Sequence, residues 1–157
     1  MAEEKSGGLV AGRAVEICAN IDDMTGEDLG AAMELLLSAG ALDVWFEQIQ
    51  MKKNRPAVKL CALALPEDKE RIAELMLRHT TTLGVRMNEV ERLMLAREVR
   101  TIETRFGNVR VKRGRLGGAV RKEMPEDDDV RRIARETGLS MSAVRAAVAE
   151  DAEIQTL

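Results

Sequence analysis

Aromatic residues are scarce in this sequence: Trp45, Phe46 and Phe106 are the only ones, and tyrosine is absent. A platform of aromatic side chains for stacking single-stranded nucleic acid bases is therefore not expected. His79 is the only histidine. A zinc site built from several histidines is thereby excluded, and so is a Ser-His-Asp triad that uses any other histidine.

The two cysteines, Cys18 and Cys61, lie in apolar, strand-like stretches and do not form a CxxC motif. We expect them to be buried, reduced thiols, with a metal site or a redox pair as the less favoured alternative. No apolar run approaches the roughly 18 residues that a transmembrane helix needs, and residues 1–8 lack the pattern of a secretory signal. The sequence therefore predicts a cytoplasmic protein without a membrane contact.

The composition is that of a globular protein of about one domain's length: 157 residues, of which 45% are hydrophobic and 32% charged. The net charge of −3 is unevenly distributed, because residues 97–122 contain nine lysines and arginines against two acids. Such a basic segment is suited to an anionic ligand or a negatively charged partner. A solvated basic strand face is an equally good interpretation.

Apolar periodicity predicts the element order β-α-β-β-α-β. A strand covers residues 13–21, Thr25 caps a helix with Asp28 at the capping-box position, and Pro66 opens a second helix. This is the order of a ferredoxin-like split βαβ sandwich, so the predicted fold class is α+β. We expect an added β-hairpin and a small C-terminal helical subdomain. The predicted organisation is a flexible lead-in over 1–12, a ferredoxin-like nucleotide- and metal-binding domain over 13–118, and the helical subdomain over 119–157.

Three local features accompany this prediction. The apolar phase changes after Phe46, which predicts a bulge or bend around Glu47-Gln48. A turn at Gly107-Asn108 is expected to close the hairpin. The glycines between Gly114 and Gly118 are expected to form a flexible stretch before the C-terminal helices.

Asp22 and Asp23 are candidate metal ligands, because they stand where a strand ends and a helix begins. Carboxylates suit Mg²⁺ or Mn²⁺, which commonly bind one or two of them together with phosphate oxygens of a substrate. Glu27, one helical turn further, could add a third carboxylate. A purely structural role at the helix N-terminus is the alternative.

Two further clusters can hold phosphate. Lys52, Lys53 and Arg55 place three cations within four residues at a strand end, although a solvated hairpin loop would have the same spacing. Thr81, Thr82 and Arg86 surround a glycine and supply hydroxyl donors and another guanidinium, although an ordinary helix exit would use the same residues. Three loop clusters of complementary charge favour a site for a metal and a nucleotide.

Residues 133–144 have the turn glycine and apolar spacing of a helix-turn-helix, which is the rival class. The second helix would present Arg145 as its one arginine, and three aspartates precede the unit. Structural helix packing is therefore favoured over DNA reading.

Four segments occur in the order found in a known family: Asn20-Ile21-Asp22-Asp23-Met24-Thr25, Ala39-Gly40-Ala41-Leu42-Asp43-Val44, Gln50-Met51-Lys52-Lys53-Asn54-Arg55-Pro56 and Thr80-Thr81-Thr82-Leu83-Gly84-Val85-Arg86. Over about residues 14–148 the chain resembles the C-terminal domain of LarC, the family of nickel insertion proteins that serve the nickel-pincer nucleotide cofactor. The resemblance implies a domain that binds CTP with Mg²⁺ or Mn²⁺ and belongs to a CTP-dependent cyclometallase.

In that family Ni²⁺ is the substrate metal and pyridinium-3,5-bisthiocarboxylic acid mononucleotide is the acceptor, while CTP yields CMP and pyrophosphate. The resemblance implies an N-terminal LarC domain as a partner, either a separate chain or a missing part of this one. We expect Asp22 and Asp23 to hold the metal, and Lys52, Lys53, Arg55, Thr81, Thr82 and Arg86 to bind the nucleotide. The residues identify no general base.

A non-catalytic oligomerisation or ligand-sensing module is the alternative function, because edge strands and methionine-rich helix faces permit self-association. A homo-oligomer is expected in either case.

Overall fold

The computed structural model describes residues 3–5 and 9–154, which form two compact units. Unit 1 comprises residues 12–92, and unit 2 comprises residues 93–154 together with the described residues among 3–11. The long strands β2 (Leu9–Ile21) and β5 (Arg86–Thr104) contribute to both units. None of the helices in the described ranges combines the length and the apolar character needed to cross a membrane.

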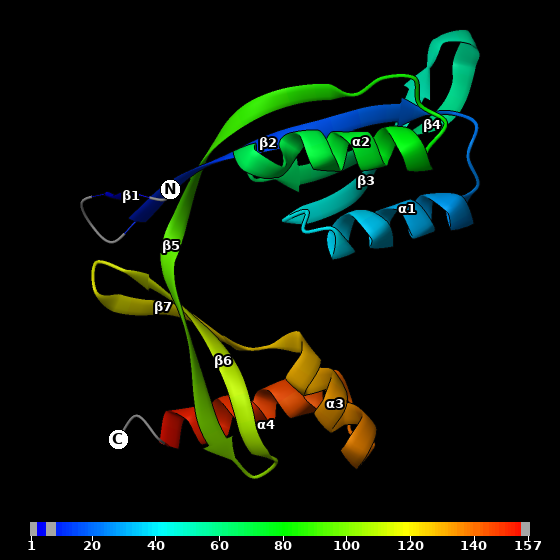
Figure 1. The fold of residues 1–157 in the computed structure, drawn as a ribbon. Coiled ribbons are helices and arrows are strands. Elements are labelled where there is room, and N and C mark those ends of the chain that lie inside the picture. Colours follow the sequence, from blue (N-terminus) through cyan, green and yellow to red (C-terminus); the bar gives the residue numbers. More distant parts are fainter. Residues whose placement is uncertain (1–2, 6–8, 155–157) are drawn as a thin grey trace. The chain divides into compact units, whose positions relative to one another are not determined.

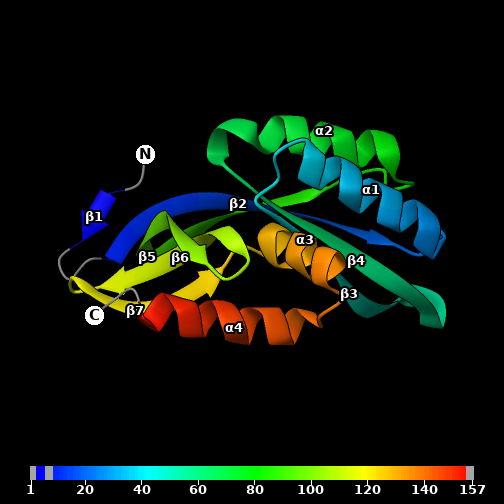
Figure 2. The ribbon, with the colours of Figure 1, turned by 90° about the horizontal axis from the view of Figure 1, so that it is seen from below.

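Unit 1 has the predicted ferredoxin-like topology (Figure 1). Its sheet has the strand order β3-β4-β2-β5, and its further elements are α1 (Gly26–Ser38), β3 (Asp43–Met51), the 3₁₀ turn η1 (Lys52–Asn54), β4 (Arg55–Ala64), the 3₁₀ turn η2 (Pro66–Asp68) and α2 (Lys69–His79). Both α1 and α2 lie on the same face of this sheet (Figures 1 and 2). The α+β class and the split βαβ order are thus confirmed.

Alternation along the strands separates the two faces of the unit 1 sheet. On β2, Ile17 and Ile21 pack into a core with Leu36 of α1 and Met76 of α2, and all four are at most 4% exposed. Residues in the opposite phase point away from α1 and α2, and we call this second surface the far face. It carries Glu16 and Cys18 of β2, Glu47 of β3, and Lys59 and Cys61 of β4.

The predicted helix starts are confirmed in unit 1. Thr25 is the N-cap of α1, and its Oγ1 accepts a hydrogen bond from the backbone N–H of Asp28 at 3.1 Å. Pro66 opens the 3₁₀ turn that leads into α2.

The bulge predicted at Glu47-Gln48 is wrong. Strands β3 and β4 pair without interruption from Asp43, opposite Leu63, to Met51, opposite Arg55. The apolar phase changes because the second half of β3 presents Ile49 to the far face, whereas Val44 packs in the core. A regular strand can change the face that it buries when it lies at the sheet edge.

Unit 2 consists of a three-stranded antiparallel sheet, formed by the second half of β5, β6 (Gly107–Leu116) and β7 (Ala119–Pro125), and the helices α3 (Asp127–Thr137) and α4 (Met141–Ile154). The short strand β1 (Glu3–Lys5) pairs with the start of β2. A second core joins β5 and β6 to both helices through Ile102, Val109, Val130, Ile133 and Val144. Figure 2 shows α3 and α4 beside each other.

The predicted hairpin is present, but its turn lies two residues earlier than expected. Thr104 pairs with Gly107, so Arg105 and Phe106 form the turn. The flexible stretch predicted over residues 114–118 is wrong, because β6 continues to Leu116. Gly117 and Gly118, with φ of 58° and 79°, then form a tight turn into β7, which the sequence analysis missed.

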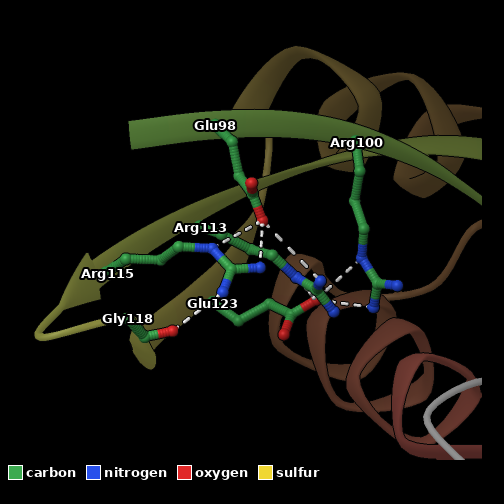
Figure 3. Close-up of polar contacts among 6 residues, drawn as sticks. All are labelled: Glu98, Arg100, Arg113, Arg115, Gly118 and Glu123. Atoms are coloured by element: carbon green, nitrogen blue, oxygen red, sulfur yellow. Dashed lines mark hydrogen bonds and ion pairs between the residues drawn. The ribbon is translucent and has the colours of Figure 1, made fainter. Parts of the chain in front are cut away.

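The basic segment over residues 97–122 is largely paired with acids. On the sheet of unit 2, one Glu123 oxygen lies 2.9 Å from Arg113 and 2.8 Å from Arg100, and Glu98 lies 2.9 Å from Arg115 (Figure 3). The arginines lower the pKa of Glu98 chiefly through the hydrogen bond from Arg115. These ion pairs favour the interpretation of a solvated basic strand face.

The two helices of the helix-turn-helix pattern pack on the sheet of unit 2. Gly138 ends α3 with a φ of 73°, and Ser140 Oγ accepts from the backbone N–H of Ala143 at 3.2 Å at the start of α4. Arg145, the one arginine that a DNA-reading second helix would present, lies 2.6 Å from Asp127 of α3. It therefore links the two helices.

The units divide within β5, whereas the sequence analysis placed a boundary at residue 118. Of the expected lead-in over 1–12, residues 1, 2 and 6–8 lie outside the described residues, while 3–5 and 9–12 are strand. Residues 155–157 of the expected helical subdomain also lie outside them. A compact unit need not fold independently. The predicted division of the chain into domains therefore stays a prediction.

Candidate functional site

The three polar clusters found in the sequence meet at one end of the unit 1 sheet. Strand β2 ends at Ile21, which pairs with Val58 near the beginning of the adjacent antiparallel strand β4. The end of β2 therefore lies beside the η1 turn that precedes β4. The loop between α2 and β5 reaches the same end of β2, where Thr81 contacts Asp23.

Arg55 and Asp22 form the first link. Nη1 of Arg55, the first residue of β4, lies 2.9 Å from Oδ2 of Asp22, immediately after β2. The Asp22 side chain is 22% exposed and that of Arg55 is 58% exposed. A predicted metal ligand and a predicted phosphate ligand are thus neighbours.

Thr81 and Asp23 form the second link. The hydroxyl of Thr81 donates to Oδ1 of Asp23, joining the loop after α2 to the loop after β2. Thr80 fixes the beginning of this loop by donating to the carbonyl oxygen of Met76 at 2.8 Å. Thr82, by contrast, bonds within its own loop, since its hydroxyl donates to the carbonyl oxygen of Gly84 at 2.9 Å.

Arg86 and Asn20 form the third link. Nη2 of Arg86, at the start of β5, donates to Oδ1 of Asn20 at 2.7 Å. Asn20 is on β2, two residues before Asp22, so Arg86 is bound near the end of the strand that the acidic pair follows. The sequence analysis did not assign a role to Asn20, although it belongs to the first of the four segments that carry the family resemblance.

The η1 turn presents Lys52 and Lys53 to solvent, and neither makes a polar contact with another described residue. Lys53 and Asn54 have φ of 62° and 56°, in the left-handed region that costs side chains other than glycine or asparagine about 1 kcal/mol or more. Both lysine side chains therefore project from a tightly turned backbone, and their charges are not neutralised by a carboxylate in the described chain.

A hollow of about 480 Å³ opens beside Asp23, between α1 and the loop that follows α2. Its lining residues include Asp28, His79 and Thr81 as well as the apolar Met24 and Leu35. Asp28 rather than Glu27 is the acid of the first helical turn that lines it. Asp28 was expected only in the capping box of α1, and His79 stands in no motif that would indicate a role at the site.

The far face of the same sheet holds the two thiols. Cys18 and Cys61 are free and at most 2% exposed, as predicted, and their Sγ atoms lie 3.1 Å apart. Burial raises the pKa of both thiols, and hydrogen bonds to Cys61 and Glu16 raise that of Cys18 further. Beside them, hydrogen bonds from Trp45 and Lys59 lower the pKa of Glu47.

Topology and site define a class of protein: a ferredoxin-like α+β domain with carboxylates, cations and threonine hydroxyls gathered at one end of its sheet. Within this class the chain belongs to the family described as Nickel insertion protein, which matches residues 2–145.

Two curated relatives carry the name pyridinium-3,5-bisthiocarboxylic acid mononucleotide nickel insertion protein. The one from Alkaliphilus metalliredigens is 43% identical over 142 residues, which cover 90% of this chain and 34% of that protein. The one from Akkermansia muciniphila is 44% identical over 126 residues, covering 80% and 31%. The chain therefore spans about a third of the length of these relatives.

Solved structures agree with this assignment. One, described as LarC2, the C-terminal domain of a cyclometallase involved in the synthesis of the NPN cofactor of lactate racemase, in its apo form, is 40% identical with a TM-score of 0.84. The match covers 91% of this chain and 99% of that one. Protein MK0293 from Methanopyrus kandleri is 25% identical with a TM-score of 0.68, covering 93% of this chain and 91% of that one.

Proposed function

We propose that this chain is the CTP- and metal-binding domain of an enzyme that inserts nickel into pyridinium-3,5-bisthiocarboxylic acid mononucleotide. The observation that carries the proposal is the meeting of Asp22, Asp23, Arg55 and Thr81 at one end of the unit 1 sheet. The likeness to the LarC2 domain over nearly its whole length supports the same function.

The donor chemistry fits Mg²⁺ or Mn²⁺. Both ions prefer hard oxygen ligands and retain room for phosphate oxygens. Arg55 contacts Oδ2 of Asp22 and Thr81 donates to Oδ1 of Asp23, so the other oxygen of each carboxylate makes no hydrogen bond within the described chain. These two oxygens are the proposed metal ligands.

The cations around this pair are suited to a triphosphate. Lys52, Lys53, Arg55 and Arg86 bring four positive charges to a site with two carboxylates. A divalent ion and these side chains together offset the charge of a nucleoside triphosphate, and the hydroxyls of Thr81 and Thr82 can donate to phosphate oxygens. Such a site acts by positioning the nucleotide and stabilising charge as CTP is converted to CMP and pyrophosphate.

The rest of the proposal concerns the whole protein. The pyridinium mononucleotide and Ni²⁺ would be its substrates, an N-terminal LarC domain its partner, and a homo-oligomer its assembly. A cytoplasmic location belongs to the proposal too, because thiols such as Cys18 and Cys61 stay reduced there.

Isothermal titration of the chain with CTP, with and without Mn²⁺ and with ATP as the control, tests the proposal. We expect binding that depends on the metal and prefers CTP. The absence of heat with either nucleotide, in a chain whose circular dichroism shows it to be folded, would contradict nucleotide binding by this domain alone.

A further inference from the structure

The far face of the unit 1 sheet brings two thiols and two carboxylates together from three strands. Cys18 of β2 and Cys61 of β4 are directly opposite each other in the strand register. Glu16 lies two residues before Cys18, on the same face, and Glu47 lies on the neighbouring strand β3. This group uses none of the side chains assigned to the nucleotide site.

The four side chains form a chain of contacts that runs from Glu16 through both thiols to Glu47. Sγ of Cys18 lies 3.1 Å from Sγ of Cys61 and 3.2 Å from Oε1 of Glu16, and Sγ of Cys61 lies 3.8 Å from Oε1 of Glu47. One possible ligand atom from each of Glu16, Cys18 and Cys61 lies within 4.8 Å of the other two. Donor atoms at such separations can be bridged by a single metal ion.

We propose that Glu16, Cys18 and Cys61 bind a nickel ion, with Glu47 completing the set of donors. Thiolates select borderline and soft ions such as Ni²⁺ and Zn²⁺ over Mg²⁺ and Mn²⁺. On binding, each thiol forms a bond to the metal and loses its proton to solvent, so no oxidant or reductant is required.

The donor set alone suits several transition metals, zinc among them. The choice of nickel rests on the proposed function, since the chain belongs to a family of nickel insertion proteins. The test therefore compares nickel with zinc.

The surroundings can accept the charged form of the site. Two thiolates neutralise the divalent ion, and the carboxylates then leave a net negative charge. Lys59 faces this site from β4, with its Nζ 3.2 Å from Oε1 of Glu47, where it offsets part of that charge. The Glu47 side chain, which contacts Cys61, is 45% exposed, so the site borders solvent on this side.

The test is a titration of the reduced, untagged chain with NiCl₂, followed by near-ultraviolet absorption and without any nucleotide. We expect saturation at one equivalent with a thiolate-to-nickel charge-transfer band, and sulfur neighbours in the nickel X-ray absorption spectrum. The Cys18→Ser, Cys61→Ser double variant should lose the band. The Glu16→Gln variant, which keeps both buried thiols, should bind nickel at least about tenfold more weakly.

Two controls keep the assignment specific. Glu34→Gln, an exposed change on α1, and His79→Gln, at the hollow, should both retain wild-type nickel binding. Nickel bound by Asp22 and Asp23 would have oxygen neighbours only, so failure at the thiol site and failure of nucleotide binding are distinguishable.

Three results would overturn the proposal. They are a charge-transfer band that persists in a folded double cysteine variant, an absence of sulfur neighbours in the wild-type spectrum, and saturable binding of ZnCl₂ with none of NiCl₂. The spectrum of the wild-type chain decides the matter even if the double variant does not fold.

Discussion

Arg55 Nη1 lies 2.9 Å from Asp22 Oδ2, although the two residues are 33 positions apart in the chain. The contact joins the end of β2 to the start of β4. Asp22 is a proposed metal ligand and Arg55 a proposed phosphate ligand, and in this structure the two side chains contact each other. In the proposed function, nucleotide and metal therefore bind together. Phosphate oxygens can replace the Asp22 carboxylate as the hydrogen-bond partner of Arg55, which leaves that carboxylate available to the ion.

The acidic pair should account for the metal dependence of CTP binding. Replacing both residues, as Asp22→Asn with Asp23→Asn, removes two charged ligands but keeps the shape of the side chains. We expect the gain in CTP affinity on adding Mn²⁺ to disappear, while the weak binding without metal is retained or improved. Titration calorimetry with and without Mn²⁺ measures this. An undiminished Mn²⁺ effect in the double variant, with Glu34→Gln as the matched control, would argue against these ligands.

Two substitutions at Lys53 separate the effect of its charge on CTP binding from the effect of its backbone conformation on stability. Lys53→Ala and Lys53→Gly should both weaken CTP binding, because each removes the same ammonium group. Lys53→Gly should in addition raise the melting temperature relative to Lys53→Ala, since glycine adopts a φ of 62° at about 1 kcal/mol less cost. Calorimetric titration and thermal unfolding give the two readouts. Unchanged affinity in both variants would remove Lys53 from the phosphate site.

Acid should destabilise unit 2 through Asp129. A hydrogen bond from the Arg110 side chain, 3.0 Å away, holds the pKa of Asp129 below its ordinary value. A carboxylate whose pKa is lower in the folded state stabilises the fold above the unfolded pKa, about 3.9, and that contribution is lost as pH falls through the folded pKa.

We therefore expect the unfolding free energy to fall below about pH 4 and to fall less steeply in Asp129→Asn. At neutral pH this variant should cost about 1 kcal/mol, because it removes the charge from a carboxylate that accepts hydrogen bonds from the backbone N–H and the half-exposed side chain of Arg110. Urea unfolding at several pH values measures both effects. Parallel pH profiles for wild type and variant would contradict this role of Asp129.

The two cores predict separate responses to core substitutions. Ile133 is fully buried in unit 2, and truncation to alanine should cost about 2–5 kcal/mol there. If the units fold independently, Ile133→Ala lowers the temperature of one calorimetric transition, and Leu60→Ala in unit 1 lowers the other. A single transition shifted as a whole by both changes would establish one cooperative domain.

Sequence periodicity was sufficient for most of unit 1. Residues such as Ile17 and Met76 recur at strand and helix spacing because one face of each element is buried, so the order β-α-β-β-α-β could be predicted. Strand β7 escaped detection because six of its seven residues are exposed and it carries no apolar alternation. Its position is determined by pairing with β6 and by the turn at Gly117-Gly118. The residues of β7 themselves give no sign of either.

The site was predictable as a set of loops but not as a set of contacts. Charge and position at strand ends identified Asp22, Arg55 and Thr81, and the topology brings them together. The hydrogen bond between Arg86 and Asn20 could not be predicted, since it depends on the pairing of β5 with β2. The same limitation hid the cysteine pair, because Cys18 and Cys61 come together only through the register between β2 and β4.

Strand β2 serves both proposed sites, with Cys18 on its far face and Asp22 just beyond its end. Four residues of extended chain span no more than about 14 Å, so this backbone limits the separation of the two residues. A substrate metal and a nucleotide bound at these positions would be held within roughly the length of a nucleotide by a single rigid element. A substitution that bends β2 should for that reason disturb the delivery of nickel and the binding of nucleotide at once.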